Sequence, residues 1–558
     1  MTNVTTTAPA APPARTAPAP LFAKRKVNKG HLRKKTSDAA TAPVNDVDQD
    51  KSAVQSPQAP GAAAVYSTAE SLHKLTINDA ATSSDAKQSQ PATTPTAPPS
   101  DADAKGARII DGPVSPEFVA YFRSCLPPST KATDLTIELV PNKRRGLIAH
   151  RAYAVGDLLW REDPVVALPF AEEADSECAW CFATAAPNGK LLRCTACAAV
   201  MYCSRDCQRR DWSLHKHECP HFKTKKDYPI AVRFFARMMR LREAKATTPT
   251  GHDWWSLVEE LHWAPLEHAE AENMARAIFA AAKLVSRDTL PSPSAAMQFM
   301  SILQTNGLTV HHTSDLARKA DGLYVATAMA NHACDPNAIC VFSGRSVTVR
   351  CLRPIAEGDE VTINYVDVCQ PEPDRQRDLK HFHFTCACAL CVRERADAVG
   401  KGAKQKVEIR TLADHDRAVA DPTIDPRLLQ EPRRHLISQL MARPDTADYA
   451  AVARLATALM DTYAQYLGSI HPVTLFHVPP ALKAQVHLLD ERPSSLAEAH
   501  AQIQSAQALL AGFRQWQRDV KVWGYAGEDI RAMDVDTAVQ ALQQFVGMLE
   551  MGLRSRAF

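Results

Sequence analysis

The sequence predicts an α+β protein in which a cysteine-rich insert interrupts a β-rich core and an all-α domain follows. Three observations predict this class. Residues 133–168 alternate apolar and polar side chains between Gly and Pro, which is typical of short strands. Residues 178–219 contain closely spaced pairs of cysteines. Beyond residue 391, apolar residues recur three and four positions apart, which is typical of amphipathic helices.

The first 107 residues are predicted to form a disordered, low-complexity arm. Ala, Pro, Thr, Ser, Gln and Asp dominate it, so folding would bury too little apolar surface to offset the ordering entropy. A basic run from Lys24 to Lys35 resembles a nuclear-import signal or a nucleic-acid contact, and a solvated stretch without function is the alternative. No aromatic residues for base stacking interleave with it, which weighs against nucleic acid as a partner. We expect localisation in the nucleus and/or cytoplasm.

Composition excludes several classes of protein. The chain has no run of about 18 apolar residues, so no membrane span is expected. Its 15 cysteines without a secretory signal favour metal ligation in a reducing compartment over disulfides. The net charge of +3 is too small to commit the protein to nucleic acid or an acidic membrane. We expect a monomer.

Helices are expected on the C-terminal side of the cysteine-rich insert. Residues 229–243 and much of 254–303 have apolar side chains spaced three and four apart, and β-like alternation resumes at Gly322. Two further apolar faces, over 506–516 and 535–549, predict long C-terminal helices.

Four pairs of metal ligands lie within the cysteine-rich insert. Two residues between paired cysteines allow both thiolates to reach one tetrahedral Zn²⁺ at about 2.3 Å. The pairs alternate, which suggests two interleaved, closed sites of structural zinc. His217 rivals His215, but His215 and Cys219 are four residues apart and so lie on one helical face. The expected ligands are Cys178, Cys181, Cys203 and Cys207 for one ion, and Cys194, Cys197, His215 and Cys219 for the other.

This spacing, with Tyr202 before Cys203, resembles the MYND finger, an adaptor module that typically binds short proline-containing peptides. Three further stretches, 142–149, 331–337 and 358–365, resemble the signature of SET-domain lysine methyltransferases. A finger inserted between the first stretch and the other two is similar to the arrangement in the SET-MYND family. The resemblance runs from about residue 133 to 395.

The resemblance and the composition together divide the chain into seven parts. They are a disordered arm (1–107), the N-terminal part of a SET domain (133–177), a MYND zinc finger (178–219), a helical linker and SET insert (220–321), the SET catalytic core (322–366), a zinc-bound post-SET segment (367–395) and a helical C-terminal domain (396–558).

The resemblance implies methyl transfer from S-adenosylmethionine to a lysine side chain of histone and/or non-histone proteins. It implies that Tyr365 is the catalytic residue and that Phe382 and Leu308 line the substrate channel. It also implies a set of cofactor contacts: Lys143, Arg145, Asn306, Asn331, His332, Tyr365 and Phe384. The post-SET cysteines Cys386, Cys388 and Cys391 supply three thiolates, and we expect Cys334 as the fourth ligand of a third structural zinc.

One departure from the family pattern leaves an alternative open. Arg144 stands where the family has a glycine, a residue that allows close backbone approach. The alternative is a catalytically inactive SET-MYND scaffold, or a transcriptional adaptor that acts through MYND–peptide binding. The presence of Tyr365, Asn331 and His332 favours the active enzyme.

Overall fold

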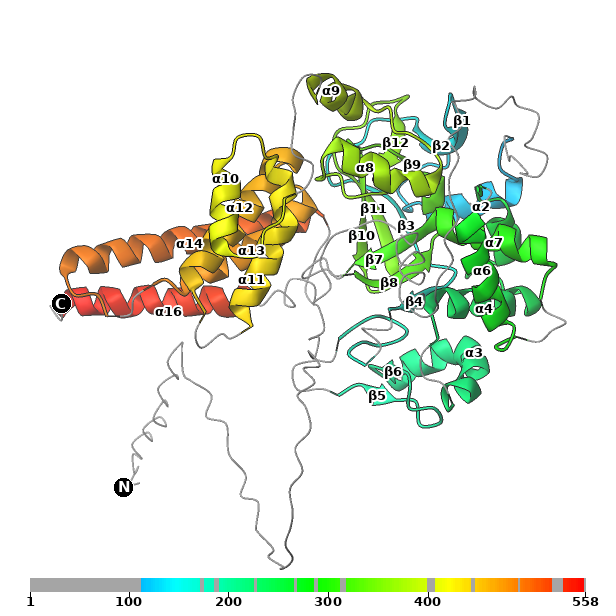
Figure 1. The fold of residues 1–558 in the computed structure, drawn as a ribbon, viewed down its shortest axis with the longest axis horizontal. Helices are drawn as coiled ribbons and strands as arrows, with labels where there is room; N and C mark the ends of the chain where they lie inside the picture. The colour runs from blue at the N-terminus through cyan, green and yellow to red at the C-terminus, as the bar shows by residue number, and fades with distance from the viewer. Residues whose placement is uncertain are drawn as a thin grey trace, which may run out of the picture.

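The structure is a computed structural model that describes eleven stretches of the chain. They are residues 112–170, 175–184, 190–224, 228–264, 268–285, 290–311, 318–398, 407–442, 447–489, 492–523 and 535–555. The arm predicted at 1–107, with its basic run, lies outside them. Over the described residues the fold is α+β, as predicted, with a mixed core beside a helical lobe (Figure 1).

Strands from both sides of the cysteine-rich insert build the β core. Within the described residues the sheets have the strand orders β1-β2-β12-β9, β10-β11-β3 and β4-β8-β7. Their bounds are β1 Leu135–Val140, β2 Arg144–Ala149, β3 Leu158–Glu162, β4 Ala167–Pro169, β7 Gly307–His311, β8 Arg318–Leu323, β9 Asn331–His332, β10 Ala338–Ser343, β11 Ser346–Cys351 and β12 Glu360–Ile363.

Each of these sheets pairs a strand that precedes the insert with one that follows it. Val361 of β12 lies opposite Leu147 of β2, and the two strands are antiparallel. In the same way β11 pairs with β3, and β8 pairs with β4. The apolar side chains that alternate along these strands are buried, so pairing and core formation fix the register together. The two distant parts of the sequence therefore form one core.

The prediction that β structure resumes at Gly322 was wrong. Two strands, β7 and β8, begin earlier and form an antiparallel pair in which Leu308 lies opposite Gly322. The region predicted as helical linker and insert therefore ends in strands. β7 follows the preceding helix directly: that helix ends at Asn306 and β7 begins at Gly307, so the helical spacing runs up to the strand without an intervening loop.

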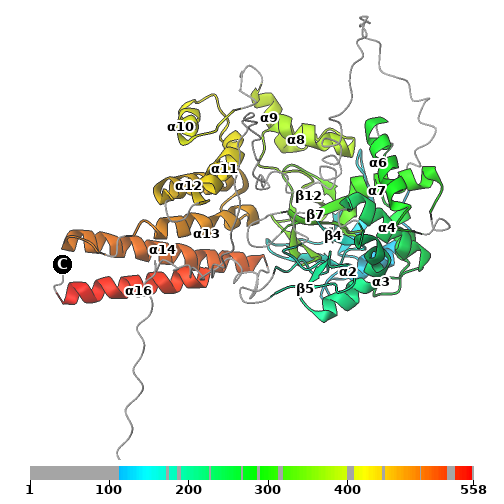
Figure 2. The same cartoon turned by 60° about the horizontal axis from the view of Figure 1, so that its bottom comes forward.

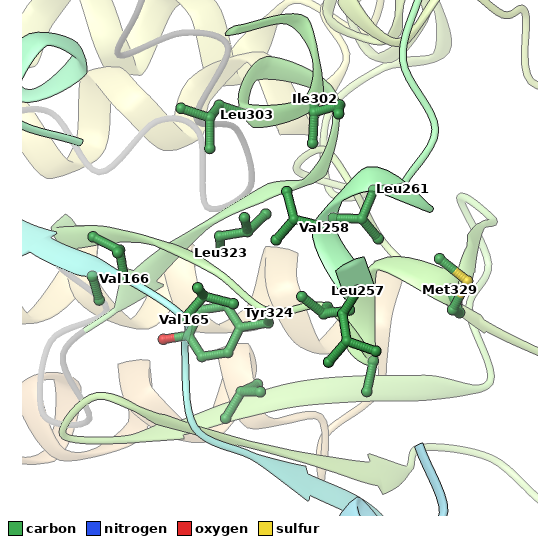
Figure 3. Packing of buried hydrophobic residues seen from close by; sticks show 14 of the residues in the cluster. Val165, Val166, Leu257, Val258, Leu261, Ile302, Leu303, Leu323, Tyr324 and Met329 are labelled. Carbon is green, nitrogen blue, oxygen red and sulfur yellow. The ribbon is translucent and has the colours of Figure 1, made fainter. Parts of the chain in front are cut away.

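Helices cover the sheet that contains β4 and β8. The prediction of helices over 229–243 and within 254–303 is confirmed by α4 Ile230–Glu243, α5 Trp254–Glu259, α6 His268–Ala281 and α7 Pro293–Asn306. Leucines and valines of α5 and α7 pack with those of the strands in one cluster, and Figure 3 shows Val258 beside Leu323 within it.

One helix before the β core was not predicted. In α2, Pro116–Cys125, Ser115 caps the N-terminus by accepting the backbone N–H of Phe118, and Pro116 occupies the first turn. Phe118, Tyr121 and Phe122 are buried. Their spacing of three and four residues is the sequence signal for this helix.

In the predicted all-α C-terminal region, every described element of regular secondary structure is a helix. Its helices are α10 Leu412–Ala420, η6 Pro426–Leu429, α11 Gln430–Met441, α12 Tyr449–Leu467, α13 Pro472–Val486, α14 Leu496–Val522 and α16 Val535–Arg554. The long α14 and α16 run side by side away from the core (Figure 2). Ile339 and Val341 of β10 share an apolar cluster with α13, α14 and α16. The helical lobe therefore packs against the sheet that contains β10. No described helix is both long enough and apolar enough to cross a membrane.

The finger contains β5 Leu192–Arg193, β6 Met201–Tyr202 and α3 Arg205–Phe222, and a buried charge network docks it onto α4. The guanidinium of Arg237 in α4 donates to Asp211 at 2.7 Å and to Glu218 at 2.7 Å, both in α3. Asp211 also accepts the hydroxyl of Tyr202 at 2.7 Å. The three charged side chains are almost fully buried. The neighbouring guanidinium charges hold the pKa of Glu218 well below its ordinary value against the effect of burial.

Replacing Arg237 should loosen the finger. In Arg237→Leu the buried Asp211 loses this cation and Glu218 keeps the longer ion pair with Arg233, so we expect the free energy of unfolding to fall by about 3–5 kcal/mol. The measurement is urea denaturation followed by tryptophan fluorescence. Arg209→Ala is the control, because its ion pair with Asp206 is exposed and should contribute less than about 1 kcal/mol. Equal midpoints for the two variants would contradict a structural role for the network.

Candidate functional site

A cavity of about 750 Å³ opens between the four-stranded sheet, the loop after α5 and the segment that follows η5 Lys380–Phe382. Its size is in the range of pockets that hold a small-molecule ligand. Most of the predicted cofactor and channel residues line it. They are Lys143, Arg145, Asn306, Asn331, His332, Tyr365, Phe382 and Phe384.

A short parallel pairing brings the two central residues together. Ile363 of β12 lies beside His332 of β9, so Tyr365, two residues past Ile363, reaches the His332 ring. The backbone N–H of Tyr365 donates to His332 Nδ1 at 2.9 Å. Burial lowers the pKa of His332 to about 3, so the ring is neutral and its proton lies on Nε2, 3.2 Å from Cys334 Sγ.

Aromatic rings surround the phenol of Tyr365. The ring centroids of Phe382, His332 and Phe384 lie 4.8, 5.3 and 6.4 Å from that of Tyr365. The Tyr365 hydroxyl donates to the carbonyl of Ala330 at 2.8 Å. Burial raises its pKa above the ordinary value, so the phenol stays protonated at neutral pH. Its oxygen can therefore accept a hydrogen bond but does not act as a phenolate base.

Glu360, to which the sequence analysis gave no role, ties two predicted cofactor contacts together. Its carboxylate accepts from Asn331 Nδ2 at 2.8 Å and from Lys143 Nζ at 2.6 Å. Asn331 Nδ2 also donates to the carbonyl of Arg145 at 2.9 Å. A Cβ on Gly146 would come within 2.8 Å of the Asn331 amide and 2.9 Å of the Glu360 carboxylate. The absence of a side chain at Gly146 thus permits the close approach of Asn331 and Glu360 to the β2 backbone at this wall of the cavity.

Arg145 and Asn306 line the cavity but already hold backbone groups. The Arg145 guanidinium donates to the carbonyls of Gly112, Glu260 and Pro113. Asn306 donates to the carbonyls of His262 and Ile302. Both side chains therefore fix the loops at the rim, a role that their contacts show directly.

Arg144 adopts the backbone conformation that a glycine at this position would favour. Its φ is 67°, in the left-handed region, where a side chain costs about 1–2 kcal/mol. Its guanidinium lies 2.6 Å from a ring nitrogen of His262 across the cavity rim. The hairpin between β1 and β2 keeps its conformation with arginine in place of glycine.

The ligands predicted for the finger gather into two groups of four. In each group all donor atoms lie within 4.8 Å of one another, and His215, not His217, completes the second. The Cys181–Cys203 and Cys194–Cys219 sulfur pairs are 3.5 and 3.8 Å apart. Tetrahedral ligands bonded to zinc at about 2.3 Å would lie about 3.8 Å apart, so the donor set fits zinc.

A third group forms one wall of the cavity. Cys334 joins Cys386, Cys388 and Cys391, with Cys334 and Cys391 sulfurs 3.4 Å apart. Four thiolates again match structural zinc. Cys386 and Cys388 line the cavity, so a metal held here would fix the segment that carries Phe382 and Phe384.

Leu308 does not belong to the cavity lining. It lies on β7 and packs against the main core, whereas its neighbours Thr305 and Asn306 face the cavity. Sequence reasoning also missed Glu260 and the loop behind it, because nothing in their local sequence indicates that α5 ends at a cavity.

Comparison with known proteins agrees with this arrangement. The model of the MYND finger matches residues 178–219. N-lysine methyltransferase SMYD2-A of Xenopus laevis is 30% identical over 280 residues, covering 49% of this chain and 63% of that protein. Human N-lysine methyltransferase SMYD2 is 28% identical (50% and 64% covered), and histone-lysine N-methyltransferase ASHR1 of Arabidopsis thaliana is 28% identical (46% and 55% covered).

The chain thus spans 55–64% of the length of these relatives. Among solved structures, Rubisco LSMT bound to AdoMet aligns with 78% of this chain and 92% of that one, at 12% identity and a TM-score of 0.29. The structure shows a β core built across an inserted MYND finger, with a four-cysteine segment beside its cavity. The chain therefore contains a MYND finger and is similar, over about half of its length, to proteins named as lysine methyltransferases.

The metal content tests the three groups of ligands. We expect three zinc ions per chain by mass spectrometry of the purified protein, because each group offers a closed tetrahedral set. His215→Ala should lower the count toward two, and the matched control His217→Ala should keep three. A count of two in the unaltered protein that does not fall in Cys388→Ser would rule out the third site.

Proposed function

We propose that this protein transfers a methyl group from S-adenosylmethionine to the side-chain amine of lysine in other proteins. The observation that carries the proposal is the cavity in which Tyr365, His332 and Asn331 meet beside Phe384. The relatives that bear the names of lysine methyltransferases support it. When bound, S-adenosylmethionine would supply an electrophilic methyl group on a sulfonium.

The residues of the wall suit such a ligand. Phe384 is 39% exposed within the cavity and offers a ring face for an adenine. Lys143 presents a cation at the rim, paired with Glu360, that can also meet a carboxylate. Asn331 and His332 of β9 line the cavity beside it. The chemistry of these groups fits a molecule with an aromatic base and an amino-acid end.

The rings around Tyr365 address the main energetic obstacle to methylation. A lysine amine has an ordinary pKa near 10.4, so populating its neutral form at pH 7 costs about 4–5 kcal/mol. Phe382 and the edge of Phe384 would exclude water from the amine and so favour the neutral form. The Tyr365 oxygen, whose hydrogen is given to Ala330, would accept an amine hydrogen and align the lone pair.

The proposals for partners and location rest on the similarity to these relatives and on the sequence. We propose histone and/or non-histone proteins as substrates and proline-containing peptides as ligands of the finger, on which Trp212 is 44% exposed. We further propose a monomer in the nucleus and/or cytoplasm, with the basic run Lys24–Lys35 as import signal.

Loss of the Tyr365 hydroxyl should remove the activity. With labelled S-adenosylmethionine and a protein mixture, Tyr365→Phe should transfer methyl at least about 100-fold more slowly, because the amine is no longer aligned. Tyr449→Phe, in the helical lobe, is the control and should retain the rate. Equal labelling by both variants would refute the assignment, and cofactor binding without any transfer by the unaltered protein would favour the scaffold.

Glu360 should act through the residues that it holds. In Glu360→Ala both Asn331 and Lys143 lose the carboxylate that accepts from them, and Asn331 keeps the carbonyl of Arg145. We therefore expect about tenfold weaker binding of S-adenosylmethionine, or about 1.4 kcal/mol. Glu360→Gln keeps an acceptor for Asn331 and should recover part of the affinity. Titration calorimetry makes the measurement, with the exposed Glu408→Ala as control. Unchanged affinity in Glu360→Ala would show that the bridge is dispensable.

A further inference from the structure

One carboxylate lies between two arginines from different parts of the fold. Glu394 is in α9 Ala389–Ala398, directly after the third group of cysteines. Its Oε2 accepts from Arg375 Nη2 at 3.0 Å, and Arg375 belongs to α8 Glu372–Leu379. Its Oε1 accepts from Arg427 Nη1 at 2.8 Å, and Arg427 belongs to η6 of the helical lobe. The three side chains are 0%, 19% and 10% exposed in the order Arg375, Glu394, Arg427.

Arg375 also reaches the third metal site. Its Nη2 lies 3.6 Å from Cys391 Sγ, and its neighbour Gln376 donates to the same sulfur from 3.4 Å. Gln376 accepts the backbone N–H of Cys386 at 3.0 Å as well. Four thiolates around Zn²⁺ carry a net charge of −2, which is costly in a buried place unless donors and cations surround it. Arg375 supplies such a charge.

Arg427 makes several contacts within the helical lobe. Asp425 accepts from it at 2.7 Å, and its guanidinium lies 4.6 Å from the ring centre of Tyr466 in α12. Close by, Gln430 at the start of α11 donates to the carbonyl of Cys369, just before α8, at 2.9 Å. Arg427, itself held by contacts within the helical lobe, therefore positions Glu394.

The metal site in turn contacts the centre of the cavity. Cys334 Sγ lies 3.2 Å from Nε2 of His332, whose Nδ1 accepts the backbone N–H of Tyr365. Cys386 and Cys388 form part of the cavity wall. A contiguous set of contacts thus runs from the helical lobe to Tyr365.

We propose that Arg427, Glu394 and Arg375 are positioning residues through which the C-terminal helical lobe holds the third zinc site and the cavity wall attached to it. Without Arg427, the Glu394 carboxylate is no longer held in place, and the Arg375 guanidinium that it positions is no longer fixed beside the thiolates. The thiolates then lose a stabilising donor, and the segment that carries Phe382 and Phe384 loosens. The inference rests on zinc binding at the third site and not on methyl transfer.

Zinc release from the full chain tests the inference. The zinc-loaded protein is mixed with an excess of a coloured chelator, and the phase that is absent in Cys388→Ser identifies the third site. We expect that phase to be about tenfold faster in Arg427→Ala and in Glu394→Gln, and up to about 100-fold faster in Arg375→Leu. The phases of the finger should keep their rates. Arg454→Ala, whose ion pair with Asp416 is exposed, is the control.

The double variant separates a shared role from general loosening. Since Arg427 acts through Glu394, adding Arg427→Ala to Glu394→Gln should accelerate release no further. An unchanged third phase in both single variants would overturn the inference, as would equal acceleration of all phases. Because zinc alone is measured, failure here is distinct from failure of the proposed methyl transfer, which Tyr365→Phe tests.

Discussion

The pairing of β12 with both β2 and β9 is the constraint on which the rest of the site depends. It joins β2, which precedes the finger in the sequence, to β12 and β9, which follow the finger. It also places Glu360 at one end of β12 and Tyr365 just past the other end. A slip of one residue would turn the alternate side chains of the strand to the opposite face. The burial of Val361 and Ile363 excludes such a slip and so aligns the cavity wall.

Metal groups and buried ion pairs replace an apolar core where the segments are short. The finger and the post-SET segment each bury only a small apolar cluster, and each contains cysteine groups suited to zinc. Each is joined to a helix by a buried arginine, Arg237 for the finger and Arg375 for the post-SET segment. Both arginines balance negative charge that would otherwise be stranded away from water.

The hairpin at the cavity rim shows how the fold accommodates an unusual residue. Arg144 keeps a left-handed backbone, at a cost in conformational energy, while Gly146 two residues on leaves room for Asn331 and Glu360. The position at which the backbone must come close to the side chains of Asn331 and Glu360 is Gly146, not residue 144. For this reason an arginine at position 144 is compatible with a formed cavity.

The sequence alone determined the elements and ligands that depend on local spacing. The helices α4 and α14 follow from apolar periodicity, and the choice of His215 over His217 follows from helical geometry. Tertiary structure alone decided that Leu308 packs into the core and that Glu360 bridges the wall. These roles depend on contacts between strands distant in the chain, and local periodicity carries no information about which strand will lie opposite.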